Sequence, residues 1–282
     1  MTAERFCVLV NSSDRGRDIF EIVFRNTEVM WRNCDWPRFA GFTSVQSDMY
    51  GFKSVAARGP SDWRGELSAQ LDSLPPEIEY VLRLEEDALF LSPVNGKKLE
   101  EIAEIMLREN LCYVSLVPVS RSMADRAVEF FRKKLSTRPL RLISFSEPYY
   151  SSLAPAIWKR AYLRELLRQP GSVWDFEFTV TRDRHYAVWE PVLDAAHIVT
   201  KGRWRRSAPR LLARQGLSLA KSTREFQTLK SRLRGVRENL SFQLFGYLSF
   251  RIRRRLNLVP AVPKDLIGTQ LGLIPGKSKS GG

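Results

Sequence analysis

Three consecutive carboxylates, Glu85, Glu86 and Asp87, stand directly after the strand-like run Tyr80–Leu84. Adjacent negative charges disfavour one another's ionisation unless a positive charge compensates them. A divalent cation takes oxygen ligands of this kind and is commonly held together with a phosphate group. The spacing therefore predicts a metal–diphosphate site at the end of a sheet strand. A solvated acidic turn is the alternative interpretation of the same residues.

The segments around these acids alternate between strand-like and helix-like patterns. Short apolar runs predict strands, and apolar residues at helical spacing predict helices. Strands are expected at Phe6–Val10, Phe39–Thr43, Tyr80–Leu84 and Leu111–Val117, and helices at Asp18–Trp31, Trp63–Leu74 and Lys97–Arg108. Such alternation predicts an α/β fold, with a mixed, mostly parallel, Rossmann-like sheet flanked by helices.

A second polar segment, Asn11–Asp14, follows the first predicted strand as Glu85–Asp87 follows a later one. In open α/β sheets, ligands bind beyond the carboxyl ends of the strands. Both segments are therefore expected at the same edge of the sheet, which favours a functional interpretation of the acids.

Composition excludes several protein classes. No apolar stretch approaches the roughly 20 residues that cross a bilayer, and the N-terminal apolar run of five residues is too short for a signal-peptide core. We therefore expect a cytoplasmic protein. Cys7, Cys34 and Cys112 are few, odd in number and far apart, which is typical of free thiols rather than a disulfide framework.

The sequence lacks other nucleotide-binding and hydrolase motifs. No GxGxxG follows the first strand, and Gly276-Lys277-Ser278 lacks the spacing of a phosphate-binding loop. The chain holds only two histidines, His185 and His197, and no GxSxG elbow supports a Ser–His–Asp hydrolase.

Several segments together resemble a bacterial glycosyltransferase family of the GT-A type, whose members serve capsule, O-antigen or lipopolysaccharide synthesis. The resemblance covers about 200 residues in order. It is carried by SSDRGRDIFEIVFRNTEVMW, FAGFTS, EYVLRLEEDALFLSPVN, PYYSSLAPAIWKRAYLRELL, SVWDFE and HIVTKGRW. It implies a GT-A-like fold and transfer of a sugar from a nucleoside-diphosphate donor. The acidic turn departs from a strict DxD.

The resemblance also implies roles for the polar segments. The acidic turn would hold Mn²⁺ or Mg²⁺, which neutralises charge on the departing diphosphate. Asp87 would be the direct ligand, with Glu85 or Glu86 touching metal or ribose. The segment Asn11, Ser12, Ser13 and Asp14 would meet the base and ribose, with Arg17 near the phosphates, although a solvated helix start is the alternative for Arg17.

Inverting transfer needs a carboxylate that deprotonates the acceptor hydroxyl. SVWDFE offers Asp175 and Glu177. On a strand the two would point the same way, whereas on a helix they would diverge and only one could face the site. Glu177 is the preferred base and Asp175 the second candidate. An Asp helix cap with a solvated Glu is the alternative.

In the segment HIVTKGRW, His197 is a candidate third metal ligand and Lys201 a candidate phosphate contact. A partly buried histidine and a surface lysine are the alternative. Leu153–Trp158 is expected to line the acceptor or sugar pocket, although for Trp158 a place in the core is slightly favoured.

The net charge of +14 is unevenly distributed. Residues 1–200 carry 26 Lys and Arg against 28 Asp and Glu, whereas residues 201–282 carry 19 against 3. The chain is therefore expected to divide into a GT-A-like domain, 1–205, and a basic, partly amphipathic, helical tail, 206–282.

The tail holds an apolar and aromatic run, Leu240–Phe250, followed by the basic run Arg251–Leu256. A basic amphipathic segment suits an anionic cytoplasmic leaflet, where each Lys or Arg contributes about 1 kcal/mol. We expect peripheral attachment to the inner face of the cell membrane. Nucleic acid is the less favoured partner, because the aromatics cluster in one run. Packing of the tail on the body is a third interpretation.

The sequence thus predicts a metal-dependent glycosyltransferase acting on a bacterial surface glycan with a lipid-linked acceptor. Two alternatives stay open. One is a metal-dependent nuclease or phosphotransferase that uses the same acids and holds nucleic acid with the tail. The other is an inactive scaffold on the membrane, because EED stands in place of DxD.

Overall fold

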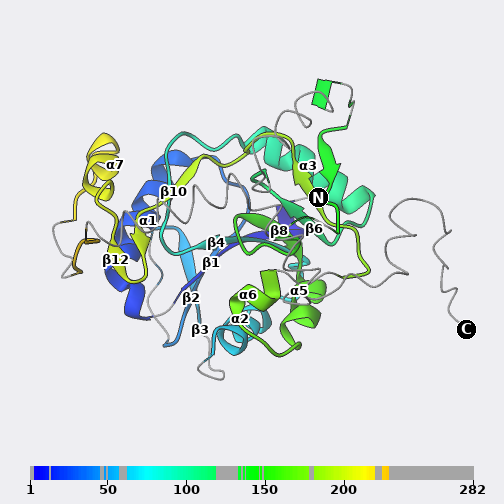
Figure 1. The fold of residues 1–282 in the computed structure, drawn as a ribbon, viewed down its shortest axis with the longest axis horizontal. Coiled ribbons are helices and arrows are strands. Elements are labelled where there is room, and N and C mark those ends of the chain that lie inside the picture. Colours follow the sequence, from blue (N-terminus) through cyan, green and yellow to red (C-terminus); the bar gives the residue numbers. More distant parts are fainter. Residues whose placement is uncertain are drawn as a thin grey trace, which may run out of the picture.

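The computed structural model describes residues 3–12, 14–44, 48, 50–56, 62–118, 133, 134, 136, 138–145, 147, 149–177, 181–219 and 224–228. Within them an eight-stranded sheet forms the centre of the molecule, in the order β3-β2-β1-β4-β8-β6-β9-β7 (Figure 1). Its strands are β1 (Phe6–Asn11), β2 (Arg38–Phe42), β3 (Phe52–Ala56), β4 (Tyr80–Glu85), β6 (Tyr113–Ser115), β7 (Leu140–Leu142), β8 (Ala156–Lys159) and β9 (Tyr186–Val188).

The sheet is mixed. Strands β3, β2, β1 and β4 run parallel to one another. Strand β8 lies antiparallel between β4 and β6, β9 pairs parallel with β6, and β7 closes the edge antiparallel to β9. The predicted mixed α/β, Rossmann-like fold is confirmed. In the parallel half the carboxyl ends of β1 and β4 meet, because Asn11 pairs with Glu85.

Helices cover both faces of the sheet, as Figure 1 shows. Alternate residues of a strand point to opposite faces. Phe6, Val8 and Val10 of β1 join a core with α1 (Arg17–Met30) and α3 (Gly96–Arg108). Cys7 and Leu9 join the opposite core, with α2 (Trp63–Asp72), α5 (Arg160–Leu167) and α6 (Val173–Glu177).

A third, smaller core lies on the outer side of α1. Ile19 and Val23 of that helix pack with Trp204 and with Leu212 of α7 (Ala208–Arg214). Two small sheets precede α7. They are β5 (Ala88–Phe90) with β10 (Ala195–His197), and β11 (Val199–Thr200) with β12 (Arg203–Trp204). The packed chain therefore continues past the predicted boundary at residue 205.

The expected elements around the acids are found within a few residues of their predicted ends. Trp158 is fully buried, on a strand of the core rather than in a pocket wall. Cys7, Cys34 and Cys112 are free. Among the described residues, no helix has the length and apolar character required to cross a membrane. Most of the predicted tail, from residue 229 onward, lies outside the described residues.

Candidate metal centre

The acidic turn connects β4 to β5. Strand β4 ends at Glu85, and β5 begins at Ala88, so Glu86 and Asp87 form the tight connection between them. Strand β10 pairs antiparallel with β5 and places His197 opposite Ala88. The backbone N–H of Ile198 donates to the carbonyl of Asp87 at 3.0 Å. This pairing brings a distant histidine beside the acids.

Glu85, Asp87 and His197 form a cluster whose potential ligand atoms all lie within 4.8 Å of one another. His197 Nδ1 lies 2.9 Å from Asp87 Oδ1 and 3.5 Å from Glu85 Oε2. The hydrogen bond to Asp87 raises the pKa of His197, although partial burial of the ring opposes the shift. The cluster thus favours a positive charge at its centre.

This donor set fits a divalent cation. Two carboxylates and an imidazole supply oxygen and nitrogen ligands of the kind that Mn²⁺ accepts, and carboxylates suit Mg²⁺. All three side chains are partly exposed, so a cation there would keep positions open for oxygens of a ligand. The structure brings together three of the predicted metal-contacting residues, Glu85, Asp87 and His197.

Glu86 points away from this cluster. Its carboxylate accepts a hydrogen bond from the Ser12 hydroxyl, and a Cβ atom at Gly16 would collide with it. Gly16 stands directly before α1, so the small residue lets the acidic turn approach the start of that helix. Glu86 therefore joins the ends of β4 and β1 to α1.

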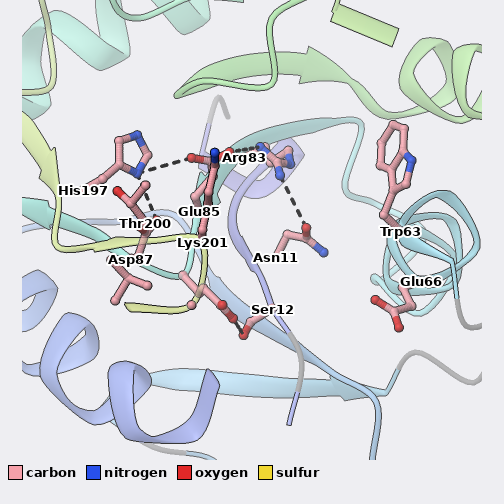
Figure 2. A pocket seen from close by; sticks show the side chains of 13 residues that line it. Asn11, Ser12, Trp63, Glu66, Arg83, Glu85, Asp87, His197, Thr200 and Lys201 are labelled. Carbon is pink, nitrogen blue, oxygen red and sulfur yellow. Dashed lines mark hydrogen bonds and ion pairs between the residues drawn. The ribbon is translucent and has the colours of Figure 1, made fainter. Parts of the chain in front are cut away.

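A cleft of about 490 Å³ opens over the cluster (Figure 2). It is lined by Asn11, Ser12, Trp63, Glu66, Arg83, Glu85, Glu86, Asp87, His197, Val199, Thr200, Lys201 and Gly202. Figure 2 shows His197 at one end and Trp63 and Glu66 at the other, with Asn11 and Arg83 between them. The predicted sheet-edge residues Asn11, Ser12, Glu85, Glu86 and Asp87 thus share one cleft.

The floor of the cleft is fixed by a buried amide. Gln70 of α2 is fully buried, accepts a hydrogen bond from Asn11 Nδ2 at 2.8 Å and donates to the carbonyl of Ser12 at 3.2 Å. A Cβ atom at Gly41 of β2 would overlap the Gln70 amide. Glycine at this position lets Gln70 reach the end of β1.

Arg83 is a buried cation beneath the cluster. It lies two residues before Glu85 on β4, so both side chains point to the face that carries α2 and α6. Arg83 donates to the carbonyl of Leu153 and, at 3.4 Å, to Asn11 Oδ1, and its Nη1 lies 3.8 Å from Glu85 Oε1. Burial lowers its pKa, while the charge of Glu85 opposes that shift. Arg83 partly compensates the carboxylates around it.

Glu177 ends α6 and turns inward. Its Oε1 accepts hydrogen bonds from the Leu153 N–H at 3.1 Å and the Ser152 hydroxyl at 3.4 Å. Burial raises its pKa, and the charge of Glu85 adds to the increase. Glu177 is not among the residues that line the cleft, but its charge interacts with those of Glu85 and Arg83. A buried carboxyl group with a raised pKa is suited to accept a proton.

Asp175 lies apart from the cluster. The segment is helical, so Asp175 and Glu177 diverge. The Asp175 carboxylate accepts hydrogen bonds from the Ser172 N–H and the Ser172 hydroxyl, each of 2.7 Å. The backbone N–H of Asp175 donates back to the Ser172 hydroxyl at 3.2 Å. This reciprocal pattern is a capping box. Hydrogen bonds from Ser172 lower the pKa of Asp175, so the residue serves the start of the helix.

Other predicted residues take different places. Asp14 is exposed and accepts hydrogen bonds from the N–H groups of Thr43 and Ser44. Arg17 is exposed at the first position of α1 and does not line the cleft. Ser13 lies outside the described residues. Lys201 is exposed at the rim of the cleft with φ of 50°.

The second histidine, His185, serves the core. It is fully buried, and its ring nitrogens contact the Tyr150 carbonyl and the Tyr162 hydroxyl, each at 2.8 Å. Burial lowers its pKa to about 3, so it is neutral at physiological pH.

Sequence reasoning missed six residues of the cleft: Trp63, Glu66, Arg83, Val199, Thr200 and Gly202. One signal was available for Arg83, a lone charge within an otherwise apolar strand, which needs a partner when buried. Trp63 and Glu66 are three residues apart on α2 and so share a helix face, but their pattern alone did not separate them from the core positions Leu67 and Leu71.

No protein-family model matches the chain, and no curated protein matches it. Among solved structures, one match is a 4-diphosphocytidyl-2C-methyl-D-erythritol synthase from Anaerococcus prevotii, with 10% sequence identity and a TM-score of 0.39. The match covers 66% of this chain and 87% of that chain. At this level of likeness no activity is transferred. The sheet and the cluster define a Rossmann-like α/β protein with a candidate metal centre at the carboxyl edge of its parallel strands.

Proposed function

We propose that this protein is a metal-dependent glycosyltransferase that moves a sugar from a nucleoside-diphosphate donor to a bacterial surface glycan. One observation carries the proposal: Glu85, Asp87 and His197 converge within 4.8 Å at the carboxyl end of β4, inside a cleft that β1 also reaches. Ligands of open α/β sheets bind at this edge. The resemblance of the sequence segments to GT-A enzymes supports the sugar-transfer chemistry.

The proposed donor site divides along the cleft. Glu85, Asp87 and His197 would hold Mn²⁺ or Mg²⁺, which when bound neutralises charge on the departing diphosphate. Lys201 at the rim adds a positive charge for a phosphate oxygen. Asn11 and Ser12 offer an amide and a hydroxyl to the nucleoside, with Asn11 held by Gln70.

Glu177 is the proposed general base. Hydrogen bonds from the Leu153 N–H and the Ser152 hydroxyl fix its carboxyl group, and burial raises its pKa. In an inverting reaction it would take the proton of the acceptor hydroxyl while the sugar leaves the diphosphate from the opposite face. The proton ends on Glu177, and the nucleoside diphosphate leaves with the bonding electron pair.

The proposed acceptor is lipid-linked and reached at the inner face of the cell membrane. Residues 229–282 carry 11 Lys and Arg against 2 Asp and Glu, and they include the run Leu240–Phe250. Such composition favours an anionic leaflet. A protein held in that plane shares it with a lipid-linked acceptor.

A thermal-shift screen of nucleoside diphosphates, with and without Mn²⁺, tests the donor site. Ligand that binds only the folded state raises the unfolding temperature, so one nucleotide should stabilise the protein in a Mn²⁺-dependent way. Donor sugars of that nucleotide are then tested for release of the nucleoside diphosphate. Cleavage of nucleic acid, with no response to any nucleoside diphosphate, would support the nuclease alternative and reject the glycosyltransferase.

A further inference from the structure

A short hairpin, residues 199–204, forms part of the rim of the cleft. The turn Lys201-Gly202 joins β11 to β12, and both turn residues line the cleft. We call β11, this turn and β12 the rim hairpin. Trp204 at its end is buried against Ile19 of α1 and Leu212 of α7. The hairpin is thus packed from behind by residues on both sides of it in sequence (Figure 1).

Residues 224–228 add a further backbone contact to the rim hairpin. The Trp204 N–H donates to the Glu225 carbonyl at 2.9 Å, and the Gln227 N–H donates to the Trp204 carbonyl at 2.8 Å. Trp204 and Phe226 form a parallel bridge. An ion pair of 3.2 Å joins Arg203 to Glu225. Part of the basic C-terminal region is therefore joined to the edge of β12.

Arg224 connects this segment to α1 and to the hairpin turn. Its Nε lies 2.8 and 3.0 Å from the two carboxylate oxygens of Asp18, in the first turn of α1. Its Nη1 donates to the Gly202 carbonyl at 3.3 Å. The side chains of Arg224 and Asp18 are largely buried, at 20% and 23% exposure. A planar guanidinium can make both contacts at once, whereas a lysine ammonium is a single point charge.

The turn that Arg224 contacts determines where Lys201 lies. Lys201 and Gly202 have φ of 50° and 74°, the left-handed pair of a two-residue hairpin turn. Asn and Gly are the residues favoured at such positions, so a lysine is not there for the turn. Backbone strain of this kind clusters at functional sites. Lys201 also stands on the cleft side of the turn, among the lining residues.

We infer that Arg224 is a positioning residue that holds the rim hairpin so that Lys201 faces a phosphate bound at the metal cluster. The inference rests on the proposed function, since it assigns the phosphate contact of the same cleft. Arg224 acts through the Gly202 carbonyl and Asp18, and it does not itself line the cleft. His197 is held separately, by the pairing of β10 with β5.

The test uses the full chain with Arg224→Gln, Lys201→Asn and the double variant. Arg210→Gln, an exposed arginine of α7, is the control for loss of one positive charge. Amide hydrogen exchange of residues 199–204 is measured without ligand. Affinity for inorganic pyrophosphate in Mg²⁺ is measured by calorimetry. We expect Arg224→Gln to speed exchange in the rim hairpin and to weaken pyrophosphate binding about threefold to tenfold.

The double variant separates positioning from general structural support. If Arg224 acts through Lys201, adding Arg224→Gln to Lys201→Asn brings no further loss of pyrophosphate affinity, because the residue that Arg224 positions is already gone and the two effects are not additive. The exchange rate and pyrophosphate affinity of Arg224→Lys should lie between those of wild type and Arg224→Gln. Lysine keeps the positive charge but lacks the planar guanidinium that makes both contacts at once. Fully additive losses, or unchanged exchange in Arg224→Gln, would overturn the inference. Absence of pyrophosphate binding in wild type would instead reject the diphosphate site, and the exchange result would still decide whether Arg224 holds the hairpin.

Discussion

The imidazole Nδ1 of His197 lies 2.9 Å from a carboxylate oxygen of Asp87, although 110 residues separate the two in sequence. Pairing of β10 with β5 produces this approach, and the Ile198 N–H to Asp87 carbonyl bond continues it. Glu85 completes the cluster from the end of β4. The acidic turn thus becomes part of a three-residue candidate metal site only because the later strand β10 pairs with β5.

Asp87→Asn tests the cluster directly. The substitution keeps size and hydrogen-bonding capacity but removes one anionic ligand, so the fold should persist. Mn²⁺ affinity should fall at least about tenfold. Loss of a residue that only supports a metal ligand already costs about that much, and Asp87 is proposed as a ligand itself. Isothermal titration with Mn²⁺ measures it. Glu104→Gln, an exposed acid on α3, is the matched control. Equal affinities in both variants would remove Asp87 from the ligand set.

Glu177→Gln separates catalysis from stability. If Glu177 is the base, turnover should drop about 10²- to 10⁴-fold while donor binding is kept. Full activity in the variant would exclude Glu177 as the base. Product formation and nucleotide affinity are measured in parallel.

The same variant has a pH signature. Burial raises the pKa of Glu177 in the folded state, so its contribution to stability is present below the unfolded pKa and is lost as pH rises through the folded pKa. Ionised Glu177 therefore costs stability at neutral pH, and glutamine removes that cost. In denaturant melts, the free energy of unfolding of Glu177→Gln relative to that of wild type should be higher at pH 7 than at pH 4. A higher relative stability of the variant at pH 4 would contradict a raised pKa of Glu177.

Gly41→Ala tests the floor of the cleft. The new methyl would overlap the amide of Gln70, which is fully buried and bonded to Asn11 and Ser12, so it cannot swing into solvent. Overpacking of this kind should cost about 1–3 kcal/mol of unfolding free energy. Urea melts measure the loss.

The matched control is Gly96→Ala at the start of α3, where a Cβ would meet nothing within 4 Å. Adding Gln70→Ala to Gly41→Ala should recover part of the loss attributed to the overlap, because the clashing amide is gone. Additive losses in the double variant would show that the destabilisation has another source.

Removal of residues 229–282 tests membrane attachment. The truncated chain keeps residues 224–228 and their contacts to Trp204 and Asp18. It loses 11 Lys and Arg against 2 Asp and Glu. Binding to vesicles with anionic lipid should drop to the level of neutral vesicles in co-sedimentation, and should weaken in wild type as salt is raised. Undiminished binding of the truncated chain would place the anchor within residues 1–228.

Local patterns in the sequence determined the fold class and one side of the site. Alternating strands and amphipathic helices predicted the mixed α/β sheet, and the acids after β4 and the polar residues after β1 were expected at one edge. Asn11 pairs with Glu85 there. These inferences hold because strand and helix periodicity, and the direction of parallel strands, are short-range properties of the chain.

Tertiary structure decided what the sequence left open. The helical form of Val173–Glu177 turned Glu177 inward and left Asp175 as a cap. Packing of α2 placed Gln70 under Asn11, and Arg83 became a buried cation. Arg224 reached Asp18 across 206 residues of sequence. Such contacts depend on which elements meet in space, and residue spacing along the chain carries no record of that.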